Sequence, residues 1–164
     1  MEHVTVLGAG SWGTALAIVL AENGHNTLLW THREDQAAEI NNSHTNKQYL
    51  PTTVLPTNLR ATASLEEAVA HAKTIVVAVP TKAIREVCSN VANLLNETKL
   101  FVHVSKGIEP DTLLRISELM KESIDPQYIE EIVVLSGPSH AGEVVLQHPT
   151  TVSATCTSME AAEK

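Results

Sequence analysis

Short runs of β-branched and other apolar residues alternate along the chain with longer segments whose apolar residues recur at helical spacing. The short runs predict strands at residues 4–7, 27–31, 59–62, 74–79, 100–104, 132–135 and 151–155. The longer segments predict helices at residues 11–22, 34–41, 64–72, 82–95, 112–124 and 140–147. The helix at 64–72 starts with Ser64-Leu65-Glu66-Glu67, which predicts a capping box between Ser64 and Glu67. Strands that are apolar on both faces and are each followed by a helix form parallel sheets covered on both sides. The pattern therefore predicts a doubly wound α/β fold.

A polar segment, residues 42–58, interrupts this alternation. It contains two prolines and a single charged side chain, that of Lys47. Loops of this length in compact domains are usually either functional or disordered. Tyr49 in this loop has two interpretations that the sequence leaves open. It belongs to a flap that closes over a ligand, or it anchors the loop on the domain.

The last seven residues, 158–164, have the pattern of a helix start, with a serine N-cap, an acid in the first turn and helix-forming residues. A natural domain seldom ends within two turns of the start of a helix. The length of 164 residues fits one domain of ordinary size. We therefore expect residues 1–164 to be one domain of a longer protein.

Composition and charge exclude several classes of function. The chain has 11 Lys and Arg residues against 19 Asp and Glu residues, a net charge of −8, whereas non-specific nucleic-acid binding needs a basic face. The longest apolar run, residues 15–21, is too short to span a bilayer, and no signal peptide is expected. Cys88 and Cys156 form no disulfide framework, which favours a reducing compartment. We expect a cytoplasmic protein without nucleic-acid or integral membrane contacts.

A glycine-rich segment, Gly8-Ala9-Gly10-Ser11-Trp12-Gly13, stands directly between the first predicted strand and the first predicted helix. In this position a GxGxxG pattern indicates dinucleotide binding. Gly8 permits the tight turn, Gly10 lets a diphosphate approach the backbone, and Gly13 lets the helix pack closely on the strand. Free N–H groups at the helix start then bind the phosphates. The segment predicts a Rossmann-type, mostly parallel sheet with a dinucleotide site, and a turn that only serves packing is the alternative.

In such folds the residues that distinguish NAD from NADP follow the second strand, and here they read Thr31-His32-Arg33-Glu34-Asp35. The guanidinium of Arg33 can pair with a 2′-phosphate, and His32 can flank the adenosine. A hydrogen bond to a charged group contributes about 1.5–3 kcal/mol, so this interpretation favours NADPH. Glu34 and Asp35 weaken it, because either carboxylate can bind a ribose diol. Arg33 can also be a solvated residue.

Other chemical signals indicate structural roles. The eight histidines show no metal-site spacing, so no metal is expected. His103 lies within an apolar strand, and we interpret it as a core imidazole with satisfied hydrogen bonds. The apolar stripe at residues 84, 87, 88, 91, 94 and 95 has helical spacing, which indicates core positions and an unreactive Cys88.

Four segments taken together resemble the NAD(P)-dependent glycerol-3-phosphate dehydrogenase family of the bacterial type. They are residues 8–17, 46–51, 104–109 and 135–143, which read GAGSWGTALA, NKQYLP, VSKGIE and LSGPSHAGE. The resemblance covers essentially the whole chain. It implies reversible hydride transfer between NAD(P)H and dihydroxyacetone phosphate or sn-glycerol 3-phosphate, a reaction that feeds glycerophospholipid synthesis in this family. It implies NADP or NAD as the cofactor, with NADPH favoured.

The resemblance also implies roles for individual residues. It implies cofactor contacts by Ser11, Trp12, His32, Arg33, Tyr49, Lys106 and Ala141, beside the glycines of the first turn. It implies substrate contacts by Lys106, Gly137 and Ser139. These assignments place the cofactor and the substrate together at the first turn, at the end of the second strand and at the ends of two later strands.

Two of these positions have support from the residues alone. Lys106 follows a predicted buried strand at the carboxyl edge, where doubly wound sheets bind ligands, and its ammonium can hold an anionic substrate. Residues 136–139 also follow an apolar strand and precede a helix, with a backbone suited to anions. The plainer alternatives are a surface lysine and a helix N-cap at Ser139.

The family's general base is a lysine in a second, helical domain, which these 164 residues do not include. No residue here is a clear substitute, because Lys106 matches a binding position and His140 is expected in the first turn of a helix. We therefore expect no catalytic residue within the chain, weak cofactor binding and little or no turnover. The family's homodimers form largely through the second domain, so we expect this chain alone to be a monomer.

Two other functions stay open at the level of sequence. One is the cofactor domain of another β-hydroxyacid-type dehydrogenase, against which Lys106-Gly107 and Gly137-Pro138-Ser139 argue. The other is a non-catalytic module that senses a dinucleotide through a partner, which a native chain ending at residue 164 would favour.

Overall fold

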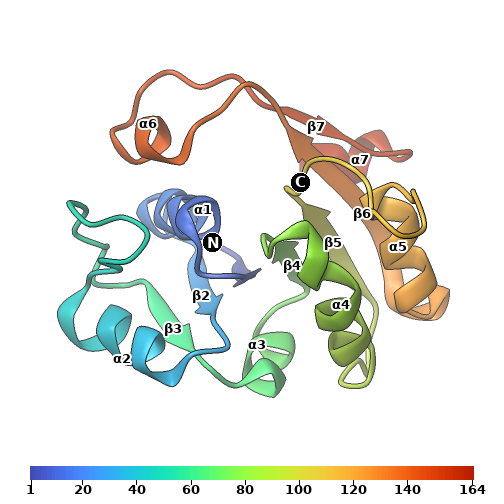
Figure 1. Ribbon diagram of the computed structural model, residues 1–164, viewed down its shortest axis with the longest axis horizontal. Coiled ribbons are helices and arrows are strands. Elements are labelled where there is room, and N and C mark those ends of the chain that lie inside the picture. The colour runs from blue at the N-terminus through green and yellow to red at the C-terminus, as the bar shows by residue number, and fades with distance from the viewer.

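The computed structural model describes all residues from 1 to 164, and its centre is a seven-stranded sheet (Figure 1). The strands are β1 (His3–Leu7), β2 (Asn26–Trp30), β3 (Arg60–Thr62), β4 (Thr74–Val77), β5 (Lys99–His103), β6 (Ile129–Ser136) and β7 (Ser153–Thr155). Their spatial order is β3-β2-β1-β4-β5-β6-β7, and all neighbours are parallel except β6 and β7. The predicted doubly wound, mostly parallel α/β sheet is confirmed.

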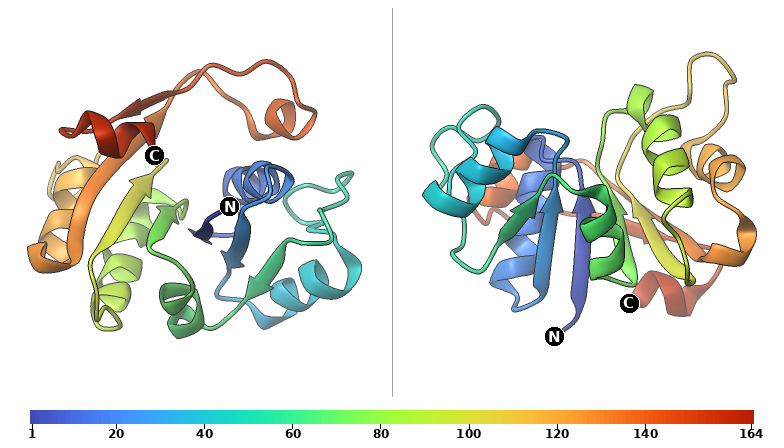
Figure 2. Two further views of the ribbon diagram at one scale, coloured as in Figure 1. Left: turned by 180° about the vertical axis from the view of Figure 1, so that it is seen from behind. Right: turned by 90° about the horizontal axis from the view of Figure 1, so that it is seen from below.

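Helices cover both faces of this sheet (Figures 1 and 2). They are α1 (Ser11–Glu22), α2 (Glu34–Ser43), α3 (Leu65–His71), α4 (Ile84–Ala92), α5 (Ile116–Ser123), α6 (Ala141–Val145) and α7 (Met159–Glu163). One apolar cluster joins the sheet to α3, α4 and α5, and includes Ile75, Phe101 and Leu119. A second joins the opposite face to α1 and α2, and includes Val6 and Leu29. Two buried cores therefore hold the carboxyl ends of the central strands in place.

Several predicted helix ends are wrong because the backbone turns where the apolar pattern continues. Residues 112–115 precede α5 instead of forming its first turn, since Leu113 has a φ of +58° in the left-handed region. Gln147, with a φ of +56°, similarly follows a shorter α6. Helix α4 ends at Ala92, so Leu94 is exposed and does not belong to the predicted core stripe.

Two predicted hydrogen-bond arrangements also differ. The hydroxyl of Ser64 accepts from the Glu67 N–H at 3.1 Å, as predicted for an N-cap. The Glu67 carboxylate accepts from Thr62 instead of from the Ser64 backbone, because the Thr62 side chain lies between them and accepts the Ser64 N–H. His103 is buried, as predicted for a core imidazole, but neither ring nitrogen makes a hydrogen bond of ordinary geometry, so the predicted satisfied hydrogen bonds are not found. Burial lowers the pKa of His103.

Candidate functional site

A cleft of about 410 Å³ opens at the carboxyl ends of the central strands. It lies beside β1 and β4, where the strand order reverses direction, which is the position at which open α/β sheets bind ligands. The segments that follow four strands, helix α2 and one loop line it, through residues 8–12, 30–32, 36, 49, 78–81, 104 and 105. Of the predicted cofactor residues, the cleft thus brings together Gly8, Gly10, Ser11, Trp12, His32 and Tyr49.

The three glycines of the first turn have different surroundings. Gly8 has a φ of +114°, and a Cβ there would lie 2.8 Å from the Ala78 carbonyl oxygen. A Cβ on Gly13 would lie 1.9 Å from the Gly8 carbonyl oxygen, so α1 can pack on the turn only without a side chain at this position. A Cβ on Gly10 would meet nothing within 4 Å. Gly8 and Gly13 therefore serve packing, whereas Gly10 leaves open space on the cleft.

The N-terminus of α1 presents unused hydrogen-bond donors to this space. Gly10 is the N-cap and supplies no side chain, and the backbone N–H groups of residues 10–13 donate to no backbone carbonyl. The first turn contains no acid. The Ser11 hydroxyl donates to the Tyr49 carbonyl at 3.1 Å. Free N–H groups and the positive end of the helix dipole together make this turn a site for an anion.

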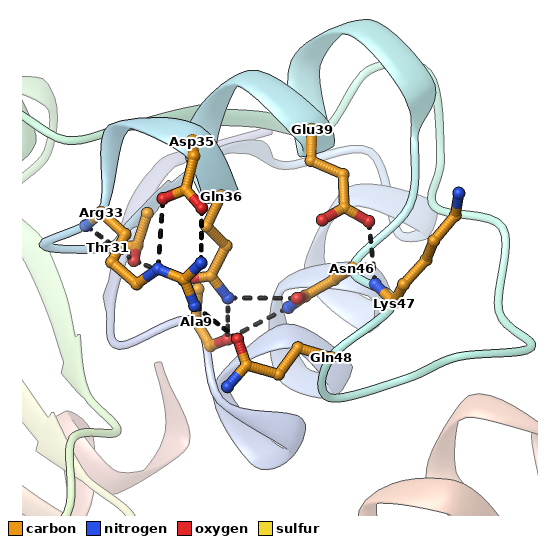
Figure 3. Close-up of polar contacts among 9 residues, drawn as sticks. All are labelled: Ala9, Thr31, Arg33, Asp35, Gln36, Glu39, Asn46, Lys47 and Gln48. Carbon is orange, nitrogen blue, oxygen red and sulfur yellow. Dashed lines mark hydrogen bonds and ion pairs between the residues drawn. The ribbon is translucent and has the colours of Figure 1, made fainter.

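Arg33 lies outside the lining of the cleft, although its neighbour His32 belongs to it. Its guanidinium donates to Asp35 from Nε at 3.1 Å and from Nη2 at 2.5 Å, and from Nη1 to Gln48 (Figure 3). The Arg33 side chain is 39% exposed. This pairing raises the pKa of Arg33 and lowers the pKa of Asp35. Arg33 is therefore neither a free cation nor an unpaired solvated residue.

The polar loop that contains Tyr49 is attached to the domain by a different residue. The Asn46 side chain is fully buried, and its Nδ2 donates to the Ala9 carbonyl at 3.0 Å and to the Thr14 hydroxyl at 2.9 Å. Tyr49 is 38% exposed and faces the cleft. Asn46 thus provides the attachment that one interpretation assigned to Tyr49, and the Tyr49 ring stays available at the cleft.

The predicted substrate residues form a second group at the carboxyl edge of the sheet. Lys106 Nζ donates to the Gly137 carbonyl at 3.1 Å, and the Ser139 hydroxyl donates to the same oxygen at 3.4 Å. The Thr81 hydroxyl, which lines the cleft, donates to the Lys106 carbonyl at 3.3 Å. A Cβ on Gly137 would lie 2.5 Å from the Thr151 carbonyl oxygen, so this turn needs glycine. The group adjoins the cleft without lining it.

Helix α6 starts differently from the prediction. His140 is its N-cap, with Nδ1 accepting from the Gly142 N–H at 3.3 Å, so neither a first-turn His140 nor an N-cap at Ser139 is correct. Ala141 is the first helical residue and does not line the cleft. The helix packs beside α1 (Figure 1).

Two general features bear on the kind of site. No three His, Cys, Asp or Glu side chains lie close enough together to hold a metal ion. No helix is both long enough and apolar enough to cross a bilayer.

Some site residues were missed by sequence reasoning. The rule that ligands bind at the carboxyl ends of strands could have indicated residues 78–81, 104 and 105, which follow β4 and β5. Gln36 and Asn46 had no such signal, because a glutamine in a helix and an asparagine in a polar loop are ordinary surface residues.

Comparisons with known proteins agree with this geometry. Residues 3–162 match the family model described as NAD-dependent glycerol-3-phosphate dehydrogenase N-terminus. Glycerol-3-phosphate dehydrogenase (NAD(P)+) of Lysinibacillus sphaericus is 68% identical over 100% of this chain and 48% of its own length. The Bacillus licheniformis enzyme is 60% identical over 99% of this chain and 47% of its own length. The crystal structure of glycerol-3-phosphate dehydrogenase from Coxiella burnetii has a TM-score of 0.90 at 31% identity, covering 99% of this chain and 49% of that chain. The chain spans about half the length of the curated relatives it matches.

Proposed function

The chain belongs to the NAD-dependent glycerol-3-phosphate dehydrogenase family, whose N-terminal part it matches, and we propose that it binds the dinucleotide for that reaction. The reaction is reversible hydride transfer between NAD(P)H and dihydroxyacetone phosphate or sn-glycerol 3-phosphate. Support comes from relatives named for this activity and from a cleft at the reversal of strand order. We also propose that the parent protein is a cytoplasmic homodimer that supplies glycerophospholipid synthesis.

The observation that carries the proposal is the first turn of the sheet. The N–H groups of residues 10–13 have no backbone acceptor, and the space in front of Gly10 is open. A diphosphate needs both donors and close approach to the backbone, so the residues present fit a dinucleotide. The nicotinamide, when bound, supplies or accepts the hydride. The protein's part in the cleft is to bind and orient the cofactor.

We assign the remaining cofactor contacts to residues at or beside the cleft. His32 and Tyr49 line it, as do Ser11 and Trp12 at the start of α1. Arg33 stands next to His32 and is the only one of these side chains that carries a permanent positive charge. We propose that both NAD and NADP bind, and that Arg33 makes NADPH the tighter ligand.

The anionic substrate is proposed to bind at the Lys106 group. The exposed ammonium of Lys106 already reaches the Gly137 carbonyl, so it is held near the carboxyl edge without being neutralised by an acid. Ser139 adds a hydroxyl to the same group. A phosphate or a polarised carbonyl is a suitable partner for this ammonium. The backbone carbonyl of Lys106 also accepts from Thr81, which lines the cleft, and this proximity supports a shared role toward cofactor and substrate.

The family resemblance implies that the proton acceptor required for alcohol oxidation lies outside these 164 residues. We therefore propose that the general base is a lysine in a second, helical domain, in the half of the curated relatives' length that this chain does not span. The 164 residues alone are then expected to bind cofactor and to turn over little or nothing.

A fluorescence titration tests the proposal. Trp12 and Trp30 both line the cleft, so NADPH or NADH should quench the emission of both in a saturable way. A Trp12→Phe variant should keep a reduced quench from Trp30. If neither dinucleotide produces a saturable quench or a heat of binding, the proposed cofactor site is disproved. A robust steady-state rate of the 164-residue chain with dihydroxyacetone phosphate and NADPH would disprove the external base.

A further inference from the structure

Two buried side-chain amides converge on one backbone oxygen beneath the first turn. Gln36 Nε2 donates to the Ala9 carbonyl at 2.8 Å, and Asn46 Nδ2 donates to the same oxygen at 3.0 Å (Figure 3). Gln36 is 5% exposed and Asn46 is 0% exposed. One residue comes from α2 and the other from the long polar loop, so segments far apart in the sequence meet at this point.

The remaining hydrogen bonds of the two amides fix their orientation. Gln36 Oε1 accepts from the Thr31 hydroxyl at 2.6 Å, and Asn46 Oδ1 accepts from Gln36 Nε2 at 3.1 Å. Asn46 Nδ2 also donates to the Thr14 hydroxyl at 2.9 Å. A carbonyl oxygen only accepts, so both NH₂ groups must face Ala9. Every polar atom of the two amides therefore has a partner, and a rotated amide would lose at least one of these bonds.

The direction of the Ala9 carbonyl decides the direction of the Gly10 N–H. Both belong to one peptide group, and the structure contains no cis peptide bond. In a trans peptide the C=O and the N–H point in opposite directions. With the carbonyl held toward Gln36 and Asn46, the Gly10 N–H points away from them, and no backbone carbonyl accepts it.

We propose that Gln36 and Asn46 are positioning residues for the diphosphate of the dinucleotide. They hold the Ala9–Gly10 peptide so that it presents its N–H, and not its carbonyl oxygen, to the ligand. The restraint is needed because glycine adopts many backbone conformations, and a rotated peptide would place a partial negative charge against the phosphates. This inference rests on the proposed dinucleotide binding at the same cleft.

Through these hydrogen bonds, the long polar loop is connected to the turn at which the cofactor is proposed to bind. Asn46 reaches the first turn from the loop that carries Tyr49, and Gln36 reaches it from the helix that follows Arg33. Neither side-chain amide is hydrogen-bonded to the Arg33 or Asp35 side chain, so the effect is expected to be the same for NAD and NADP. This equality separates the positioning role from any role in choosing between the two cofactors.

The test removes single donors with near-isosteric variants. In Asn46→Asp and Gln36→Glu an oxygen replaces the NH₂ group that faces Ala9. Gln36→Met keeps the length of the side chain without a donor, and serves where an acid prevents folding. Asn58→Asp is the matched control, because Asn58 Nδ2 donates to the Ala21 carbonyl at 2.9 Å from the same loop, and Asn58 does not line the cleft.

Affinity for NADH and for NADPH is measured by calorimetry on the folded variants, with melting temperatures as a check on folding. We expect affinity to fall at least about tenfold for both dinucleotides in the Gln36 and Asn46 variants, and by the same factor for each. Adenosine, which lacks the diphosphate, should bind these variants as it binds the unmodified chain. In ¹⁵N spectra the Gly10 amide should shift when ADP-ribose is added to the unmodified chain, and should shift much less in the variants.

The possible outcomes separate the two proposals. If the unmodified chain binds neither dinucleotide, the proposed function fails and this inference fails with it. If the unmodified chain binds both and the Gln36→Met and Asn46→Asp variants bind equally well, only the positioning role is overturned. The positioning role is also overturned if Asn58→Asp loses as much dinucleotide affinity as the Gln36 and Asn46 variants, or if those variants lose adenosine affinity by the same factor. The effect would then be a general loosening of the domain.

Discussion

The guanidinium of Arg33 and the carboxylate of Asp35 form a two-point ion pair beside the cleft, with N–O distances of 3.1 and 2.5 Å. Their neighbours in the chain, His32 and Gln36, line the cleft itself. A 2′-phosphate at this position would therefore meet a neutralised pair and not a free cation. If Arg33 contacts the cofactor as proposed, the choice between NAD and NADP should depend on both members of the pair.

Replacing Arg33 with alanine should lower affinity for NADPH more than affinity for NADH. A hydrogen bond to a charged group contributes about 1.5–3 kcal/mol, so the ratio of the two dissociation constants should change about tenfold or more. Calorimetric titrations with both cofactors at one ionic strength measure this ratio. Equal losses for the two cofactors would refute a role at the 2′-phosphate.

Replacing Asp35 with asparagine should have the opposite effect on the ratio. The variant removes the charge that competes for Arg33, so the guanidinium becomes available and NADPH should gain over NADH. The gain should shrink as salt is added, because the charges are exposed to solvent. The same titrations at low and high salt check this, and an unchanged ratio would show that the pair does not face the cofactor.

Alanine at Gly10 and alanine at Gly13 should fail for different reasons. At Gly10 the backbone has a φ of −75° and the added methyl group meets nothing, so the domain should keep its stability while both dinucleotides bind more weakly. At Gly13 the methyl group would overlap the Gly8 carbonyl, and we expect a loss of about 1–3 kcal/mol in the free energy of unfolding. Urea unfolding and cofactor titration on both variants measure the two effects. A destabilised Gly10→Ala variant would contradict the open space seen here.

The ion pair of Glu109 with Arg85 should make stability depend on pH in the acid range. Arg85 donates to Glu109 at 2.8 and 2.7 Å, and these bonds, together with one from the Thr112 hydroxyl, lower the pKa of Glu109 to about 2. The pKa of a glutamate in an unfolded chain is about 4.3. Because the folded-state pKa is the lower one, the ionised carboxylate stabilises the fold fully above about pH 4.3, and this contribution is lost as the pH falls toward 2.

Unfolding in urea at a series of pH values, for the unmodified chain and for Glu109→Gln, measures this effect. The unmodified chain should be the more stable at pH 7, and the difference should shrink below about pH 4.3. Glu122→Gln is the control, because its contact with Arg85 is longer, at 3.2 Å, and more exposed. A difference that stays constant into the acid range would rule out the ion pair as its source.

The two cysteines should react very differently with a thiol reagent. Cys88 is buried in the α4 core, and burial raises the pKa of its thiol to about 12. Cys156 is partly exposed, and its Sγ lies 3.4 Å from a Glu131 oxygen. At pH 8 the folded chain should therefore show one fast-reacting thiol, and two after unfolding. Cys156→Ser should abolish the fast phase, whereas a fast phase that persists in this variant would show that α4 opens.

Local patterns were enough to place most elements of this fold. Helix α1 has the predicted bounds, because Gly10 precedes it and Asn23-Gly24 follows it. The prediction was wrong where a residue other than glycine takes the left-handed conformation, as Leu113 and Gln147 do. Such residues are compatible with a helical pattern, and only contacts with the rest of the chain hold them in this backbone conformation.

Apolar periodicity by itself predicted the doubly wound sheet, and the glycine spacing predicted a dinucleotide turn, because each depends on residues close together in the chain. The family resemblance came from four short segments taken together. Only the tertiary structure decided that Arg33 is paired with Asp35, that Lys106 reaches Gly137, and that two amides from separate segments hold the Ala9 carbonyl. The physical reason is clearest for Gln36 and Asn46: a buried polar side chain needs a partner, and its partner is set by the packing of segments distant in the chain. The partners of the exposed Arg33 and Lys106 side chains depend on rotamers that the sequence pattern does not encode.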